Sequence, residues 1–279
     1  MEFRILGPLE VAADGELVEL GPAKPQALLG ALLLRANEVV ASNQLVDALW
    51  GKTPPATAAK LVQLYVSQLR RGLARVSGEG VLQTRPSGYL ASVDFDQLDA
   101  ERFTRLVGEG RARAEAGETK EAVLLYEEAL RLWRGPVLAG LPLESGALVE
   151  CERLEELHVA ALGERVDCEL KRGRHAQLVG ELEALTATYR LHERFWAQLM
   201  LALYRSGRQS DALDAYRRVR RRLNEQVGLE PNSALRHLER AILTQDPSLD
   251  LPDERLLAAP RRRSRLWTTG AALAVAAAT

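Results

Sequence analysis

The stretch from Ser42 to Tyr89 constrains the fold of this chain more than any other part of the sequence. Ser42 is a good N-cap for a short helix, and Gly51-Lys52-Thr53-Pro54-Pro55 ends that helix because proline cannot continue it. A longer helix follows, and Arg85-Pro86-Ser87-Gly88 then makes a turn between two β-prone runs. Few small folds are compatible with a short helix, a tight loop, a longer helix and a hairpin in this order.

The longer helix has two faces of opposite character. At about 100° per residue, its apolar residues cluster on one side and its polar residues lie nearly opposite. The apolar set is Val62, Tyr65, Val66, Leu69 and Leu73, and the polar set is Lys60, Gln63, Ser67, Arg70 and Arg71. One face can therefore pack against the preceding helices, while the other presents cations, an amide and a hydroxyl to base edges or phosphates. Leu64 lies beside the polar face, where its side chain could meet a thymine methyl group.

Positive charge is concentrated in this part of the chain. The formal net charge of all 279 residues is only −1, but residues 52–85 hold six basic residues against one acidic residue. A basic helix face can be a merely solvated surface, but Arg85 at a hairpin tip is well placed for a minor groove or a phosphate backbone. Two short β-prone runs and an apolar helix that Asn37 can end precede this stretch. We therefore predict that residues 1–93 form a winged helix-turn-helix domain that binds DNA.

The sequence offers no convincing catalytic or nucleotide-binding motif. Gly51-Lys52-Thr53 resembles the end of a phosphate-binding loop, but that loop needs a glycine where Val46 stands and a helix that begins at once. We find no plausible nucleophile–base pair. The prediction is a protein that is not an enzyme and needs no cofactor.

Two cysteines occur, and each precedes a histidine by seven residues: Cys151 with His158, and Cys168 with His175. Seven residues span about 10.5 Å along a helix, which suits one zinc ion poorly, although pairing across two helices would bring ligands together. We predict no metal site. Two cysteines and an N-terminus without a signal peptide indicate the reducing cytoplasm.

From Gln97 the sequence reads as long helices without strand signals. Gly117, Ala122, Tyr126 and Ala129 have the same spacing as a later set, Gly207, Ala212, Tyr216 and Val219. Glycine at a turn, alanine where two helices touch and an aromatic residue one turn later are typical of tetratricopeptide-like hairpins. A weaker middle unit surrounds Gly173. Residues 97–247 are therefore predicted to form an all-α, tetratricopeptide-like domain.

Residues 248–279 are predicted to be a linker and a basic, apolar tail. Arg261, Arg262, Arg263 and Arg265 precede an apolar run of 14 residues, fewer than the roughly 20 that a membrane-spanning helix needs. Disorder and contact with anionic lipid are both compatible with this composition.

The motifs resemble known families. Tyr65-Val66-Ser67-Gln68-Leu69-Arg70-Arg71 and Arg85-Pro86-Ser87-Gly88-Tyr89 are similar to the recognition helix and wing of response-regulator-type output domains. Residues 132–142, 152–170, 173–185 and 193–250 resemble the bacterial transcriptional activation domain. In this two-domain order, residues 1–250 resemble the Streptomyces antibiotic regulatory protein family.

This resemblance implies a mainly α protein that activates transcription of a secondary-metabolite gene cluster. It would bind direct repeats near a promoter as a homodimer and contact RNA polymerase holoenzyme through the loop of Gly51, Lys52 and Thr53. The DNA-facing residues implied by the resemblance are Lys60, Gln63, Ser67, Gln68, Arg70, Arg71 and Arg85. Two alternatives stay open, a helical-repeat adaptor whose winged helix contacts protein and a membrane-tethered regulator.

Overall fold

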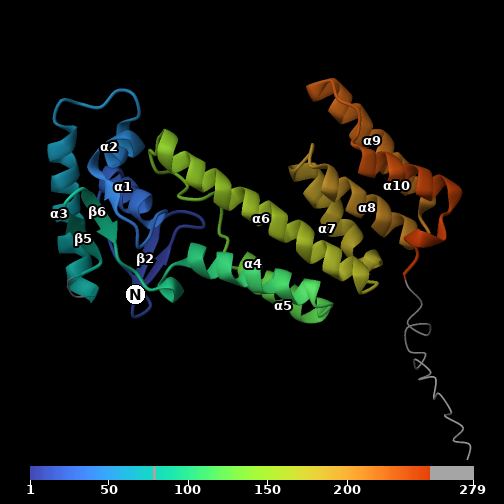
Figure 1. Ribbon diagram of the computed structural model, residues 1–279, viewed down its shortest axis with the longest axis horizontal. Coiled ribbons are helices and arrows are strands. Elements are labelled where there is room, and N and C mark those ends of the chain that lie inside the picture. The colour runs from blue at the N-terminus through green and yellow to red at the C-terminus, as the bar shows by residue number, and fades with distance from the viewer. Residues whose placement is uncertain (78–79, 252–279) are drawn as a thin grey trace, which may run out of the picture.

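Helices make up most of the computed structural model, which describes residues 1–77 and 80–251. A small α+β part lies at one end and a group of helices at the other. One long helix, α6 (Ser145–Lys171), runs between them (Figure 1). The predicted fold class, an N-terminal winged helix followed by an all-α part, is confirmed.

The N-terminal part contains two three-stranded antiparallel sheets and three helices. The first sheet has the order β1 (Glu2–Arg4), β2 (Glu10–Ala13), β3 (Glu16–Leu17). The second sheet has the order β4 (Val40–Ala41), β6 (Gly88–Ala91), β5 (Leu82–Arg85). The helices are α1 (Ala23–Leu33), α2 (Ser42–Trp50) and α3 (Ala58–Ser77).

Two predicted helix ends were wrong by a few residues. The apolar helix α1 ends at Leu33 rather than at Asn37, whose side chain instead exchanges two hydrogen bonds of 2.8 and 3.1 Å with the backbone of Val93. Ser42 is the first helical residue of α2 and not its N-cap. The side chain of Gln44 accepts the N–H of Ala41 at 3.1 Å instead, so a neighbouring polar residue satisfies this helix end.

The C-terminal part consists of seven helices and two short 3-10 turns within the described residues. The helices are α4 (Asp99–Glu115), α5 (Thr119–Leu130), α6, α7 (His175–Thr188), α8 (Glu193–Arg205), α9 (Gln209–Val227) and α10 (Ser233–Thr244). The 3-10 turns, η1 (Phe95–Gln97) and η2 (Pro247–Leu249), flank them.

Three helical hairpins share one turn geometry. Gly117, Gly173 and Gly207 have φ angles of +81°, +79° and +75°, a left-handed conformation that glycine adopts without a steric penalty. In each turn the next residue donates its N–H to the carbonyl five residues before it: Glu118 to Arg113, Arg174 to Glu169 and Arg208 to Leu203. The weak middle unit is therefore a hairpin of the same kind as the two stronger ones.

The packing positions of the repeat pattern are buried as expected. Ala122 and Tyr126 are at most 1% exposed, and their counterparts Ala212 and Tyr216 are at most 5% exposed. A Cβ atom on Gly110 of α4 would lie 2.9 Å from the Tyr126 ring, so this glycine allows α4 and α5 to approach closely.

The buried apolar residues form two clusters that do not divide at residues 93–97. The first cluster extends from Phe3 to Cys168 and includes the winged helix, α4, α5 and most of α6. The second extends from Val166 to Ile242. The first helical hairpin thus shares its core with the N-terminal part, and the domain boundaries drawn from the sequence stay a prediction.

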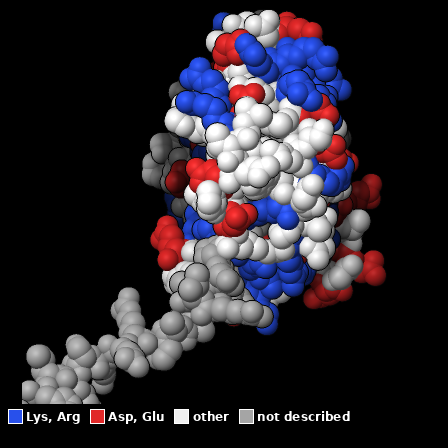
Figure 2. Space-filling model, turned by 90° about the vertical axis from the view of Figure 1, so that its right-hand side faces the viewer, with Lys and Arg blue, Asp and Glu red and all other residues white. Residues whose placement is uncertain are grey.

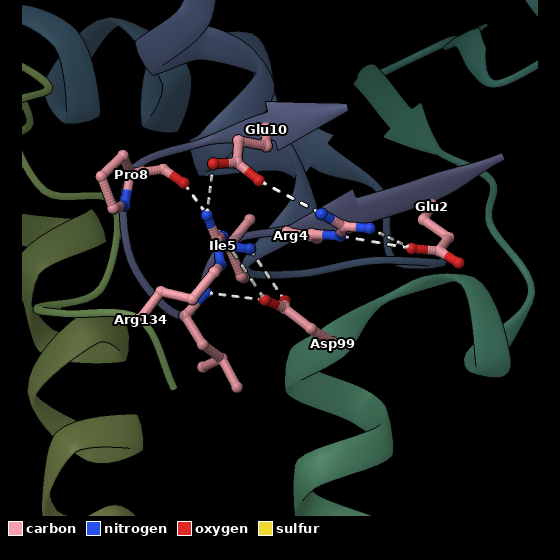
Figure 3. Close-up of polar contacts among 8 residues, drawn as sticks. Glu2, Arg4, Ile5, Pro8, Glu10, Asp99 and Arg134 are labelled. Carbon is pink, nitrogen blue, oxygen red and sulfur yellow. Dashed lines mark hydrogen bonds and ion pairs between the residues drawn. The ribbon is translucent and has the colours of Figure 1, made fainter. Parts of the chain in front are cut away.

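A buried polar contact joins the two parts (Figure 3). Asp99, the first residue of α4, is 7% exposed and accepts the N–H groups of Ile5 at 2.8 Å and Leu6 at 3.0 Å. Arg134, after α5, forms an ion pair of 2.8 Å with Glu10 of β2. Burial raises the pKa of Asp99, and the two backbone N–H groups partly oppose that shift. These contacts fix the end of β1 to the helical part.

Candidate nucleic-acid interface

The solvent-facing side of α3 carries all six of the helix residues predicted to face DNA. Val62, Val66, Leu69 and Leu73 are buried in the core at 1–2% exposure. The opposite surface exposes Lys60, Gln63, Ser67, Gln68, Arg70 and Arg71. Helical spacing aligns Lys60, Leu64, Ser67 and Arg71 in one stripe, where Leu64 remains 46% exposed. The stripe combines two cations, a hydroxyl and an apolar side chain.

Arg70 connects α3 to the wing, the hairpin of β5 and β6. Its Nε donates to the carbonyl of Leu82 at 2.9 Å, and its Nη2 donates to Oγ1 of Thr84 at 2.8 Å. Both acceptors lie on β5. Arg70 therefore positions the wing beside the helix, a role that the sequence pattern did not indicate.

The wing is tighter than the sequence predicted. β5 continues through Arg85 and β6 begins at Gly88, so Pro86 and Ser87 alone form the turn. Arg85 Nη2 donates to Oε1 of Gln83 at 2.5 Å along the same strand. A Cβ atom on Gly88 would lie 2.0 Å from the carbonyl oxygen of Val40, so glycine is required where β6 meets β4. The hairpin that carries Arg85 is thus held by Arg70 at β5 and by β4 at β6.

The loop between α2 and α3 is exposed at Lys52 and Thr53. It begins at Gly51, which has a φ angle of +56° and lies beside the Glu144 side chain at the start of α6. Trp50, just before the loop, is half-buried and stacks on Tyr65 of α3 with 6.3 Å between ring centroids. Trp50 is therefore a packing residue, and the loop lies next to both α3 and α6.

A second basic surface lies at the far end of the molecule. Figure 2 shows Lys and Arg side chains gathered in the upper part of that end, where α9 lies. Several of these guanidinium groups have structural partners: Arg220 pairs with Glu230 at 2.8 Å, and Arg218 and Arg222 lie 5.3 and 5.1 Å from the ring centre of Trp196. This surface is remote from α3, and it does not belong to the candidate interface.

The residues considered for a metal site have other surroundings. Cys151 and Cys168 are buried free thiols, and burial raises the pKa of Cys151 to about 11. His158 stacks on Trp133 at 4.1 Å, and burial lowers its pKa to about 4. Across residues 1–77 and 80–251, no three His, Cys, Asp or Glu side chains are grouped closely enough to hold a metal ion.

No helix in the same described ranges is long and apolar enough to cross a membrane. The basic cluster and apolar run predicted for the tail begin after residue 251 and lie outside the described residues.

A polar helix face beside a fixed wing, followed by repeated helical hairpins, defines a winged-helix DNA-binding regulator. Two family comparisons agree with this class. Residues 15–91 match the family described as "Transcriptional regulatory protein, C terminal", and residues 98–243 match "Bacterial transcriptional activator domain".

Individual relatives extend the match over most of the chain. Regulatory protein DnrI of Streptomyces peucetius is 40% identical over 257 residues, which cover 90% of this chain and 94% of DnrI. Transcriptional regulator RedD of Streptomyces coelicolor is 37% identical, covering 90% of this chain and 73% of RedD. Regulatory protein AfsR of Streptomyces coelicolor is 40% identical over 89% of this chain, which spans only 25% of AfsR.

A solved structure is similar as well. Mycobacterium tuberculosis EmbR, in complex with a low-affinity phosphopeptide, matches with a TM-score of 0.84 and 38% identity. The match covers 88% of this chain and 65% of the EmbR chain. The chain belongs to the Streptomyces antibiotic regulatory protein family of DNA-binding transcriptional activators. The family predicted from the sequence is confirmed.

Proposed function

We propose that the chain activates transcription by placing α3 in the major groove of promoter DNA and Arg85 against the adjacent minor groove or backbone. The observation that carries this proposal is the exposed polar stripe of α3 beside a wing that Arg70 holds in place. A helix of this width fits the major groove, and a cation on a wing favours the negative potential of a minor groove.

The side chains of α3 have separable roles in this arrangement. Lys60 and Arg71 supply positive charge to phosphates or guanine, while Gln63 and Gln68 can pair with adenine edges. Ser67 can donate or accept a hydrogen bond with a base or with a phosphate. Arg70 acts mainly as a positioning residue, because two of its donor groups are already committed to β5.

The regulated promoters, in this proposal, belong to a secondary-metabolite gene cluster and carry direct repeats. Direct repeats place two copies of the chain in the same orientation, so a homodimer on DNA would use two different surfaces for its contact. The exposed loop of Gly51, Lys52 and Thr53 next to α3 would face RNA polymerase holoenzyme. The protein would act in the cytoplasm, without catalysis or a cofactor.

Footprinting on DNA that adjoins the gene of this protein tests the proposal. Protection of tandem repeats at one constant spacing is expected. Transcription in vitro from the same DNA separates the two contacts, because Thr53→Ala in the exposed loop should reduce activation while leaving the footprint unchanged. An adaptor that uses its winged helix for protein contact alone would give no footprint at any salt concentration.

A further inference from the structure

A cavity of about 410 Å³ lies between the winged helix and the start of α6. Its apolar wall is formed by Ala31, Leu34, Val40, Leu45, Ala48 and Ala147. Ala31 lies on α1, Leu34 directly follows that helix, and Val40 lies on β4. Leu45 and Ala48 lie on α2, whereas Ala147 comes from the first turn of α6. Small-molecule sites in proteins typically have volumes of about 300–1,000 Å³ and mostly apolar walls.

The rim of this cavity carries opposite charges. Arg35 and Glu150 both line the cavity and form an ion pair of 3.7 Å, so they partly neutralise one another. Asp47 and Lys52 also line the cavity and are exposed. Neither forms an ion pair or a side-chain hydrogen bond with the rest of residues 1–77 and 80–251. The cavity thus offers one free carboxylate, one free ammonium and an apolar wall.

We propose that this cavity binds a small zwitterion with an apolar body, such as an apolar amino acid. The ammonium group of the ligand would lie by Asp47, its carboxylate by Lys52, and its apolar part against the wall of Ala31, Leu45 and Ala147. Such a ligand contacts α2, which directly precedes the DNA-facing helix, and α6 at the same time. Binding therefore stabilises the arrangement of the two parts of the chain by mass action.

Ligand binding in this cavity goes beyond the proposed DNA binding. Either proposal can fail without the other, because Lys60, Leu64, Ser67 and Arg71 of the α3 stripe do not line the cavity. Three probes that share a phenyl ring on a two-carbon chain separate the charge requirements in the full-length protein. L-Phenylalanine carries both charges, 3-phenylpropanoate only the negative one and 2-phenylethylamine only the positive one. For ligands of about 12 non-hydrogen atoms a Kd on the order of 1 mM is expected.

Calorimetry and thermal unfolding measure this binding. L-Phenylalanine is expected to bind at least ~10-fold tighter than either singly charged probe, because each lost charge removes a charge-assisted contact. At about ten times its Kd it should raise the Tm by roughly 3–6 °C. Lys52→Gln should bind L-phenylalanine no tighter than 2-phenylethylamine, which lacks the carboxylate. Asp47→Asn should bind L-phenylalanine no tighter than 3-phenylpropanoate, which lacks the ammonium group.

A blocking variant and its matched control locate the site. Gly146 lines the cavity, and a Cβ atom on it would meet nothing within 4 Å, so Gly146→Leu should be tolerated in α6 and is expected to narrow this space. Gly180 of α7 is also helical, exposed and open, and Gly180→Leu is the same substitution away from the cavity. Loss of phenylalanine binding in Gly146→Leu alone supports the proposal. No saturable binding of any probe up to about 10 mM, equal binding of all three, or equal binding in both leucine variants would overturn it.

Discussion

The contact of Asp99 with the end of β1 makes a sharp prediction about stability. Asp99→Ala removes the acceptor of two buried N–H groups, on Ile5 and Leu6, at 2.8 and 3.0 Å. Each buried donor left without a partner costs about 1–3 kcal/mol. Because burial raises the pKa of Asp99, the fold already opposes its ionised form, and removing the carboxylate returns part of that cost. The expected net loss of unfolding free energy is about 2–4 kcal/mol.

Urea unfolding of the full-length chain at pH 7 measures this loss. Asp96→Ala is the matched control, since Asp96 is 78% exposed and pairs with Arg105 on the surface. That ion pair is expected to contribute less than about 1 kcal/mol. Asp99→Asn keeps one acceptor and should give an intermediate loss. A change below about 0.5 kcal/mol in Asp99→Ala would refute the assignment of this carboxylate as the link between the two parts.

Three further predictions follow from named contacts. The protein should lose stability as the pH falls from 7 to 5, and His158→Phe should reduce that loss by about 1 kcal/mol. Burial lowers the pKa of His158 to about 4, so the unfolded chain takes up the proton first as the pH falls below about 6.5. The partial exposure of this side chain limits the size of the effect. Urea titrations at both pH values check this, and equal pH dependence in both proteins would contradict it. Gly88→Ala should cost about 3 kcal/mol or prevent folding, because its Cβ would lie 2.0 Å from a backbone oxygen, whereas Gly180→Ala should be neutral or stabilising. Arg70→Ala should speed amide hydrogen exchange in the wing and weaken DNA binding, whereas Arg71→Ala should weaken DNA binding alone; unchanged exchange in Arg70→Ala would remove its positioning role.

Much of the winged helix and of the helical part could be predicted because it is encoded locally. The two faces of α3 follow from helical periodicity, and the turn near Arg85 follows from proline, serine and glycine in succession. Two of the three helical hairpins follow from glycine and alanine at fixed spacing, whereas the middle one has Leu178 in place of the alanine and was only weakly indicated. Each of these signals lies within a few turns of the chain, so the sequence alone carries it.

The contacts that were missed link residues far apart in the sequence. Asp99 bonds to Ile5 across 94 residues, and its neighbours look like an ordinary helix start with acidic residues in the first turn. The two hydrogen bonds of Arg70 depend on where β5 lies beside α3, which no periodicity specifies. The shared core of the first cluster likewise depends on tertiary packing. The wrong assignment of Ser42 as an N-cap has a local cause. Helix α2 begins one residue earlier than predicted, and the side chain of Gln44, two residues after Ser42, accepts the N–H of Ala41 at this helix end.

The salt dependence of DNA binding tests the central claim most directly. The affinity of the purified chain for its footprinted DNA would be measured over a range of salt concentrations, alongside a Lys60→Gln, Arg71→Gln double variant. Arg217→Gln on α9, remote from α3, is the control. If Lys60 and Arg71 contact two phosphates, the plot of the logarithm of the binding constant against the logarithm of the salt concentration should become shallower in the double variant. Its slope should change by about 1.8 in the double variant and not in the control. An unchanged slope and affinity in the double variant would contradict the placement of α3 in the groove.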